Sequence, residues 1–293
     1  MFLVSATTAA TPTCDYRLVE ESRYSNFTLP GFSTNTSICM NSFFSAINSS
    51  GTIQDFIDVP NATILYWTRK IAYDTLGGAA TTSLVILDLE WPVYYNGMHL
   101  LNTSTLAALV AAIRRRVQIA RTVLPHAKIG LYDEHAANNA TVVEGYRRAS
   151  RLGLWDDVDY LIPVLYLPIG RNATNATLDV LLATAAGKTT SRGDAVPMAP
   201  LLSWLYFPYQ CAVPFDVNHA VLDTIDRFSQ RVLPIPIVQF WSGKDNETSK
   251  SQYKSGGRNH SCPMPPIAQQ SWLERANAVP ERCLPRGGSA GKR

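Results

Sequence analysis

The sequence has no long apolar run, little net charge and few metal-binding residues. No segment approaches the ~20 consecutive apolar residues of a membrane-spanning helix, so we expect no such helix. The formal net charge of +3 over 293 residues is too small to predict a nucleic-acid partner. Five cysteines without metal-binding spacing and only five histidines lead us to expect neither a metal nor another cofactor. What remains is a globular composition, with 46% hydrophobic residues, that can bury a large core.

Asparagine occurs mostly in one pattern, the Asn-x-Ser/Thr acceptor for N-linked glycans. Ten of the 15 asparagines begin such a sequon, whereas 46 Ser and Thr residues in 293 predict roughly two by chance. This excess predicts a secreted, extracellular or lysosomal glycoprotein with its glycans on exposed loops. The sequons begin at Asn26, Asn35, Asn48, Asn61, Asn102, Asn139, Asn172, Asn175, Asn246 and Asn259.

Apolar runs alternate with amphipathic segments from residue 84 onward. Near-continuous apolar strands separated by helices predict a parallel sheet that is covered on both faces. The number of repeats, with two more strands expected between residues 14 and 57, favours an α/β fold of the distorted TIM-like (β/α)7-8 barrel type over a doubly wound sheet. Strands are expected at 84–89, 128–133, 159–167, 199–207 and 235–241, and helices near 61–76, 104–124, 141–152, 177–186 and 217–231. We expect Thr103 or Ser104 to cap the helix at 104–124.

The ends of the chain differ from this pattern. Residues 1–13 end in small residues, like the remnant of a signal peptide, and 14–245 hold the expected barrel. Residues 246–293 are polar, rich in Pro and Gly and contain cysteine, which predicts a disulfide-tethered extension with a disordered end. The odd cysteine count predicts two disulfide bonds and one free or intermolecular thiol among Cys14, Cys39, Cys211, Cys262 and Cys283.

The stretch LVILDLEWP, at Leu84 to Pro92, places two carboxylates at the end of the most apolar strand. Side chains alternate along a strand, so Asp88 and Glu90 share one face, with Cα atoms about 6.5–7 Å apart. In a β/α barrel, reactive groups project from the carboxyl ends of the strands. The apolar residues beneath the pair raise the pKa of at least one carboxyl, which general acid catalysis requires. The pair predicts one neutral proton donor and one ionised stabilising group.

Aromatic residues close three of the other expected strands. Tyr132 ends KIGLYD, Tyr166 ends LIPVLY and Trp241 ends IVQFW. Sugar rings bind to surfaces that offer apolar platforms together with hydroxyl donors, and Tyr and Trp supply these. Together with the acidic pair, these residues indicate a carbohydrate-binding cleft.

The order of these segments resembles the hyaluronidase family of glycoside hydrolases. LVILDLEWP, KIGLYDEH, YLIPVLYLP, APLLSWLYF and IPIVQFWSG follow one another as the barrel strands of that family do, over roughly residues 60–245. The resemblance implies a distorted barrel and an endo-acting glycosidase for a polysaccharide that contains N-acetylhexosamine, such as hyaluronan or chondroitin. The sequence departs from the family after Glu90 and after Tyr132, at positions that concern hyaluronan specificity rather than glycosidase chemistry.

The resemblance also implies roles for individual residues. Glu90 would be the general acid that protonates the leaving oxygen, and Asp88 would orient the substrate's own 2-acetamido group as it attacks the anomeric carbon. Such retaining, substrate-assisted enzymes need no protein nucleophile. Tyr132 and Tyr166 would hold the acetamido group, and the Trp241 ring would lie beneath the bound sugar. Asp133 and Tyr206 are further substrate-binding candidates.

Two other classes of function compete with this interpretation. Asp133, Glu134 and His135 are candidate ligands of a metal-dependent barrel phosphodiesterase, although such enzymes draw ligands from several strands. A lectin-like barrel would bind glycans without cleaving them, but the sequence retains both Asp88 and Glu90. The basic segment at 113–121, IRRRVQIAR, is interpreted as the solvated face of a helix rather than as a polyanion site.

Overall fold

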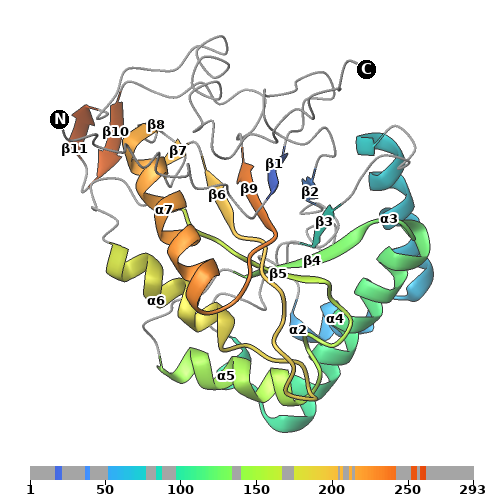
Figure 1. The fold of residues 1–293 in the computed structure, drawn as a ribbon. Helices are drawn as coiled ribbons and strands as arrows, with labels where there is room; N and C mark the ends of the chain where they lie inside the picture. Colours follow the sequence, from blue (N-terminus) through green and yellow to red (C-terminus); the bar gives the residue numbers. More distant parts are fainter. Residues whose placement is uncertain are drawn as a thin grey trace, which may run out of the picture.

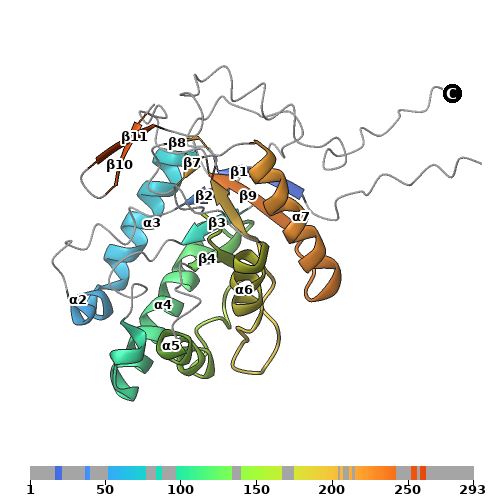
Figure 2. The same cartoon turned by 90° about the vertical axis from the view of Figure 1, so that its left-hand side faces the viewer.

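The computed structural model describes residues 17–21, 37–39, 52–76, 84–87, 97–133, 140–166, 175–203, 205–206, 211–212, 215–241, 252–255 and 258–261. These residues form an α/β fold, as the sequence predicts. Figures 1 and 2 show the parallel strands at the centre with helices α3 to α7 around them. No helix in the described part of the chain is long and apolar enough to cross a membrane.

The parallel strands form two sheets. One has the order β2-β3-β4-β5 and the other the order β1-β9-β6. Their bounds are β1 Arg17–Glu21, β2 Ser37–Cys39, β3 Leu84–Leu87, β4 Lys128–Asp133, β5 Tyr160–Pro163, β6 Leu201–Ser203 and β9 Ile237–Trp241. The strand predicted at 128–133 is confirmed residue for residue, and β1 and β2 lie in the region where two early strands were expected.

The two sheets approach each other at both edges. Single parallel bridges join Leu161 to Met198 and Val164 to Leu201, which links β5 to β6. At the other edge, β1 lies next to β2. Within the described residues, continuous hydrogen-bonded ladders do not join the sheets into one closed barrel.

The strand predicted at 199–207 is wrong in its extent. Its described part divides into β6, which pairs in parallel with β9, and β7 (Leu205–Tyr206). β7 instead pairs antiparallel with β8 (Cys211–Ala212), so it belongs to a separate hairpin. A second antiparallel hairpin, β10 (Gln252–Ser255) with β11 (Arg258–Ser261), lies in the segment expected to be an extension.

Five helices lie within two residues of their predicted bounds. They are α3 Asn61–Leu76, α4 Thr103–Val123, α5 Ala140–Arg151, α6 Asn175–Ala186 and α7 Phe215–Arg231. The helices α2 (Ile53–Asp58) and η1 (Met98–Leu100) were not expected. The signal for α2 is a capping box, in which Asp55 N donates to Thr52 Oγ1 at 3.2 Å and Thr52 N donates to the Asp55 carboxylate at 2.6 Å.

The cap predicted for α4 is wrong, because Asn102 caps this helix rather than Thr103 or Ser104. Asn102 Oδ1 accepts a hydrogen bond from Thr105 N at 2.9 Å. The Ser104 hydroxyl donates to the same oxygen at 2.8 Å. Asn is as good an N-cap as Ser, and here its side chain reaches the backbone N–H that the first turn leaves without a partner.

The solvated face predicted at 113–121 is also wrong, most clearly at Arg116. This side chain is only 1% exposed. Its Nη1 donates to Ala112 O at 2.9 Å and its Nη2 donates to Phe56 O at 2.6 Å, while the guanidinium lies 3.6 Å from the Phe56 ring centroid. Arg116 therefore links α4 to α2 through a hydrogen bond and a cation–π contact.

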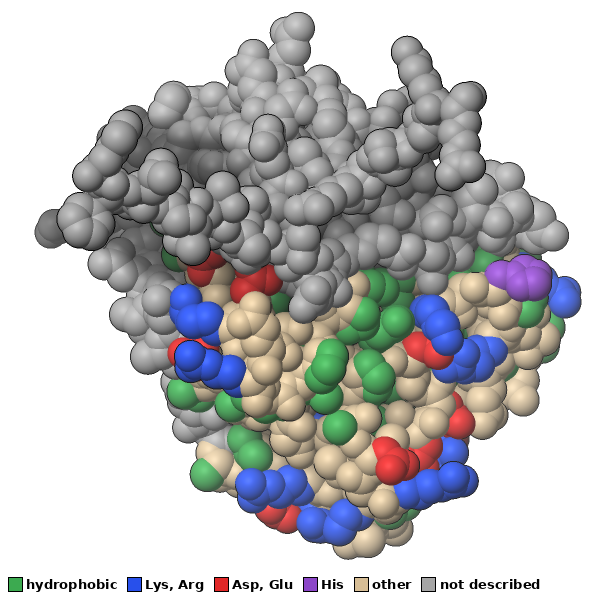
Figure 3. Space-filling view, viewed as in Figure 1, with side chains coloured by type: hydrophobic (Ala, Val, Ile, Leu, Met, Phe, Trp, Pro, Cys, Tyr) green, Lys and Arg blue, Asp and Glu red, His purple; other side chains and the backbone are tan. Residues whose placement is uncertain are grey.

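The neighbouring arginines hold other segments. Arg114 pairs with Asp157 at 2.7 Å, and Arg115 donates to Ile57 O at 2.8 Å. Arg121 pairs with Asp159 at 2.7 Å. On the face shown in Figure 3, basic side chains of the described part lie beside acidic ones rather than gathering into a basic patch. The arginines of the basic segment thus connect neighbouring elements of the fold.

Asp159 lies at the amino ends of β4 and β5 and collects three donors. Its carboxylate accepts from Ile129 N at 2.9 Å, Lys128 Nζ at 3.0 Å and Arg121 Nη2 at 2.7 Å. Burial raises the pKa of this carboxyl, but these hydrogen bonds outweigh burial and hold the pKa below its ordinary value.

We predict that Asp159→Asn lowers the free energy of unfolding at pH 7 by about 1–3 kcal/mol, because hydrogen bonds to a charged group are lost. A carboxyl whose pKa is lower in the folded state stabilises the fold at pH values above its unfolded-state pKa. This contribution is lost as the pH falls through the folded-state pKa. The difference between parent and variant should therefore close in acid, as urea unfolding at a series of pH values would measure. The exposed control Asp179→Asn should stay within about 0.5 kcal/mol of the parent at pH 7. A difference for Asp159→Asn that is constant with pH would contradict this account.

The core has two layers, one on each side of the parallel strands. The outer layer packs the sheets against the helices and contains Val85 and Leu87 of β3. The inner layer contains Leu84 and Ile86 of the same strand, because neighbouring side chains alternate between faces. It consists of Leu84, Ile86, Tyr132, Ile162, Ala199, Leu201 and Ile237, with Tyr160, Val164 and Tyr166 packed against it.

Gly145 allows α5 to pack closely on η1. A Cβ at this position would lie 2.7 Å from His99 N, a backbone atom that cannot move independently. We predict that Gly145→Ala destabilises the fold by about 1–3 kcal/mol through overpacking. In the control Gly187→Ala, the new Cβ would lie 3.5 Å from the carbonyl oxygens of Ala183 and Thr184, an ordinary contact. Thermal unfolding of both variants tests the difference, and equal melting temperatures would refute it.

Candidate active site at the carboxyl ends of the strands

The inner layer brings two of the predicted substrate-binding tyrosines together. Tyr132 is the penultimate residue of β4 and is paired with Ile162 of β5. It is buried in the inner layer, and the half-buried Tyr166 packs against the same cluster from the segment after β5. Both tyrosines therefore lie on the inner face, towards the carboxyl ends of adjacent parallel strands, where α/β proteins bind their ligands.

The predicted acidic pair follows β3 directly. Asp88 and Glu90 lie outside the described residues, which end at Leu87 on this strand. Leu84 and Ile86, four and two residues before Asp88, belong to the inner layer. The pairing of β3 with β4 ends with Leu87 opposite Leu131, one residue before Tyr132.

For the other predicted site residues, the structure describes the backbone alone. Asp133 is the last residue of β4, opposite Pro163. Trp241 is the last residue of β9, opposite Glu21 of β1 and Ser203 of β6. Tyr206 lies in the antiparallel hairpin, opposite Cys211, and not on a parallel strand.

A polar residue on β9 was missed from the sequence. Gln239 is fully buried, and its Nε2 donates to Ala199 O at 2.7 Å. Its Oε1 has no hydrogen-bond partner among the described residues. Gln239 precedes Trp241 by two residues, so both positions share a face of the strand. A single Gln inside the apolar run IVQFW was the available signal.

Metal-binding groups do not cluster in the part of the chain that the structure describes: no set of three or more His, Cys, Asp or Glu residues is placed to hold an ion. Glu134 and His135, two of the candidate phosphodiesterase ligands, lie outside this part. The described side chains on the inner face are apolar, aromatic or amide groups.

Central parallel strands, covering helices and tyrosines on the inner face together define an α/β fold of the kind that places its ligand site at the carboxyl ends of the strands. The fold is similar to that of bee venom hyaluronidase, with a TM-score of 0.57 and 12% sequence identity over 79% of this chain and 92% of that chain. For the same enzyme in complex with hyaluronic acid tetramer, the TM-score is 0.52 and the identity 14%, over 79% of this chain and 91% of that chain. No protein-family model matches the sequence, and no curated protein sequence matches it either. The predicted resemblance to hyaluronidases is thus confirmed as a distant resemblance in fold.

Proposed function

We propose that this chain is a secreted glycoside hydrolase that cleaves polysaccharides containing N-acetylhexosamine, of the hyaluronan or chondroitin kind. The observation that carries the proposal is the alternation along β3, in which Leu84 and Ile86 face the inner layer. Continued by two and four residues beyond Ile86, this alternation would direct Asp88 and Glu90 to the same face. The fold shared with bee venom hyaluronidase supports it.

The proposal includes a distorted barrel of seven parallel strands. The order β1-β2-β3-β4-β5-β6-β9 is supported by the two ladders, by the bridges from β5 to β6 and by the proximity of β1 to β2. If the pairing of β3 with β4 continued by one residue beyond Leu87, which is opposite Leu131, Asp88 would be opposite Tyr132. The proposal requires this register, which would bring the acidic pair to the inner-layer tyrosines.

In the proposed mechanism, the acetamido carbonyl oxygen of the substrate attacks the anomeric carbon as the glycosidic C–O bond breaks. Glu90 donates its proton to the leaving oxygen and Asp88, as the carboxylate, stabilises the positive charge that develops on the acetamido nitrogen. Water, deprotonated by Glu90, then opens the cyclic intermediate at the anomeric carbon. The second displacement restores the configuration, so the enzyme retains stereochemistry.

The aromatic residues provide the remaining contacts in this proposal. Tyr132 and Tyr166 hold the acetamido group, and Trp241 lies beneath the sugar ring. Asp133 and Tyr206 contact neighbouring parts of the polymer. The burial of Tyr132 and the half-buried position of Tyr166 in one cluster support a site closed to bulk water around the acetamido group.

Secretion and N-glycosylation belong to the same proposal. Ten sequons support it, and the asparagines of two of them, Asn61 and Asn102, are exposed on the described surface. Mass spectrometry of the protein secreted by eukaryotic cells, before and after treatment with a glycosidase that removes N-linked glycans, tests it. A secreted protein without any glycan mass would contradict it.

Substrate assistance is tested by changing the acyl group on the substrate's nitrogen. Hyaluronan is N-deacetylated and then re-acylated with either acetyl or trifluoroacetyl groups, so that the two polymers share the same chemical history. We expect the re-acetylated polymer to be cleaved and the trifluoroacetylated one to react more than about tenfold slower, because fluorine withdraws charge from the attacking oxygen; tenfold is about 1.4 kcal/mol of activation free energy. Equal rates would show that the acetamido group does not take part.

A further inference from the structure

Asn102 begins one of the ten sequons, and the structure describes its whole side chain. The residue is exposed and lies between η1 and α4, and its sequon continues through Thr103 to Ser104. Every sequon adds equally to the excess in the sequence, so the excess predicts a glycoprotein without naming the asparagines that carry glycans. At Asn102 the hydrogen bonds distinguish the two polar atoms of the side chain.

These two atoms have separate roles. Oδ1 accepts from Thr105 N at 2.9 Å and from the Ser104 hydroxyl at 2.8 Å, so the helix cap uses the oxygen. Nδ2 has no hydrogen-bond partner among the described residues. An N-linked glycan is attached at Nδ2 and leaves the carbonyl oxygen in place. Capping and glycosylation are therefore compatible on the same side chain.

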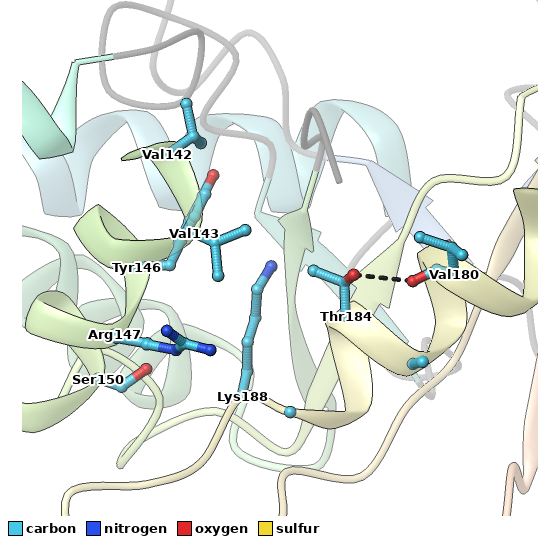
Figure 4. A pocket seen from close by; sticks show the side chains of 10 residues that line it. Val142, Val143, Tyr146, Arg147, Ser150, Val180, Thr184 and Lys188 are labelled. Carbon is cyan, nitrogen blue, oxygen red and sulfur yellow. Dashed lines mark hydrogen bonds between the residues drawn. The ribbon is translucent and has the colours of Figure 1, made fainter. Parts of the chain in front are cut away.

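The backbone next to Asn102 is held against α5. The carbonyl oxygen of Leu101 accepts from Arg148 Nη2 at 2.9 Å, and η1 packs on α5. On the other side of α5, Figure 4 shows Lys188 extending between α5 and α6, and its ammonium lies 4.3 Å from the Tyr146 ring centroid. Because α5 is packed on both sides, the point at which a glycan would be attached is fixed relative to the neighbouring surface.

That surface includes Leu100, which at 76% exposure is the most exposed large hydrophobic residue of the described part. Leu100 is two residues before Asn102, so their Cα atoms are at most about 7 Å apart. The first sugar of an N-linked glycan is N-acetylglucosamine, which has apolar C–H faces and an acetamido methyl group. Contact with such a face removes the leucine side chain from water, which is favourable. A sugar on Nδ2 is therefore a suitable cover for Leu100.

From these contacts we propose that Asn102 carries an N-linked glycan while it caps α4, and that the first N-acetylglucosamine covers Leu100. The inference rests on the secretion that the proposed function includes, but not on glycosidase activity. In the transfer, Nδ2 forms a bond to the anomeric carbon of an oligosaccharide that is linked to a lipid through a diphosphate. The bond from that carbon to the diphosphate oxygen breaks, and the diphosphate leaves with the electron pair. Nδ2 gives up one proton and keeps the other, and Oδ1 is unchanged.

Glycopeptide mapping of the protein secreted by eukaryotic cells tests the site. We expect a glycan on Asn102 in the parent and in Ser104→Thr, which keeps the sequon, but none in Ser104→Ala, which keeps the Asn102 cap. Asn102→Asp, which retains a capping oxygen, is a second variant without this glycan. Glycans at other sequons but none at Asn102 would overturn this inference and leave the proposed secretion intact. A secreted chain without any glycan would contradict both.

Melting temperatures of these secreted variants test the contact with Leu100. We expect Ser104→Thr to melt about 2–4 °C above Ser104→Ala, because the glycan covers much of one leucine side chain. In a Leu100→Ser background this difference should fall by at least about half, since contacting groups are not additive. Val232→Ser is the matched control, because Val232 is 61% exposed and follows α7, and it should leave the difference unchanged. An equal difference in all three backgrounds would overturn the proposed cover.

Discussion

Replacement of Glu90 by Gln is expected to lower kcat for polysaccharide hydrolysis by about 10²–10⁴-fold, the usual contribution of a general acid. Gln has nearly the shape of Glu but cannot donate the proton that the leaving oxygen needs. Polymer binding should persist, so the loss should fall on kcat rather than on KM. Steady-state measurement of reducing-end formation separates the two constants.

The control for this variant is Glu144→Gln. Glu144 lies on the exposed side of α5, where it pairs with Arg147 at 3.6 Å and Arg151 at 3.2 Å, and it is expected to leave kcat unchanged. If Glu90→Gln cleaves as fast as the parent, Glu90 is not the acid. If the parent and the Glu90→Gln variant both bind polymer and neither cleaves it, the chain is a glycan-binding barrel of the lectin kind.

Arg116→Met is expected to give the largest loss of stability, about 3 kcal/mol in the free energy of unfolding. Burial, and to a smaller extent the like charge of Arg115, lowers the pKa of Arg116 to about 9. The guanidinium therefore keeps its proton at neutral pH. Met fills much of the volume but donates nothing to Phe56 O, and the loss of a hydrogen bond from a charged group costs about 1.5–3 kcal/mol. The lost contact between the cation and the Phe56 ring adds about 1–2 kcal/mol.

Urea unfolding followed by circular dichroism measures this loss. The matched control is Arg151→Met, because the Arg151 side chain is 66% exposed and its pairing with Glu144 lies on the surface. This control should stay within about 0.5 kcal/mol of the parent. An Arg116→Met variant as stable as Arg151→Met would show that the predicted solvated face was the better description of α4.

The elements that could be predicted from the sequence are those whose local signals agree. The helix at 61–76 and the strand at 128–133 are confirmed because periodicity, flanking turn residues and length point to the same element. The strands β1 and β2 were expected only within a broad range. β1 carries charged residues and β2 has only three residues, so neither shows an apolar run.

Burial of Arg116 could not be predicted from the sequence, because its partner Phe56 is 60 positions away. Local pattern alone favours exposure for Arg, and only the tertiary packing of α2 on α4 reverses this preference. The prediction of the α4 cap was wrong for a different reason. Three adjacent residues, Asn102, Thr103 and Ser104, are all good caps, and helix geometry decides among them.

For the candidate site, strand alternation predicted that Asp88 and Glu90 share one face, and this stays a prediction because both lie outside the described residues. Tyr132 and Tyr166 were expected where two apolar runs end, and the structure places both in one cluster because these runs lie on neighbouring strands. Tyr206 did not follow this pattern, because the chain turns into a hairpin after β6. The buried amide of Gln239 was missed, because an isolated polar residue in an apolar strand is only a weak signal.

Reducing-end formation by the parent protein, measured in the presence of a chelator, tests the central claim most directly. The substrates are hyaluronan, chondroitin, chitin oligomers and peptidoglycan, each at acidic and neutral pH. We predict cleavage of at least one of these N-acetylhexosamine polymers at a rate that the chelator does not change. The absence of new reducing ends on every polymer, or activity that disappears with chelator and returns with a divalent metal ion, would contradict the account.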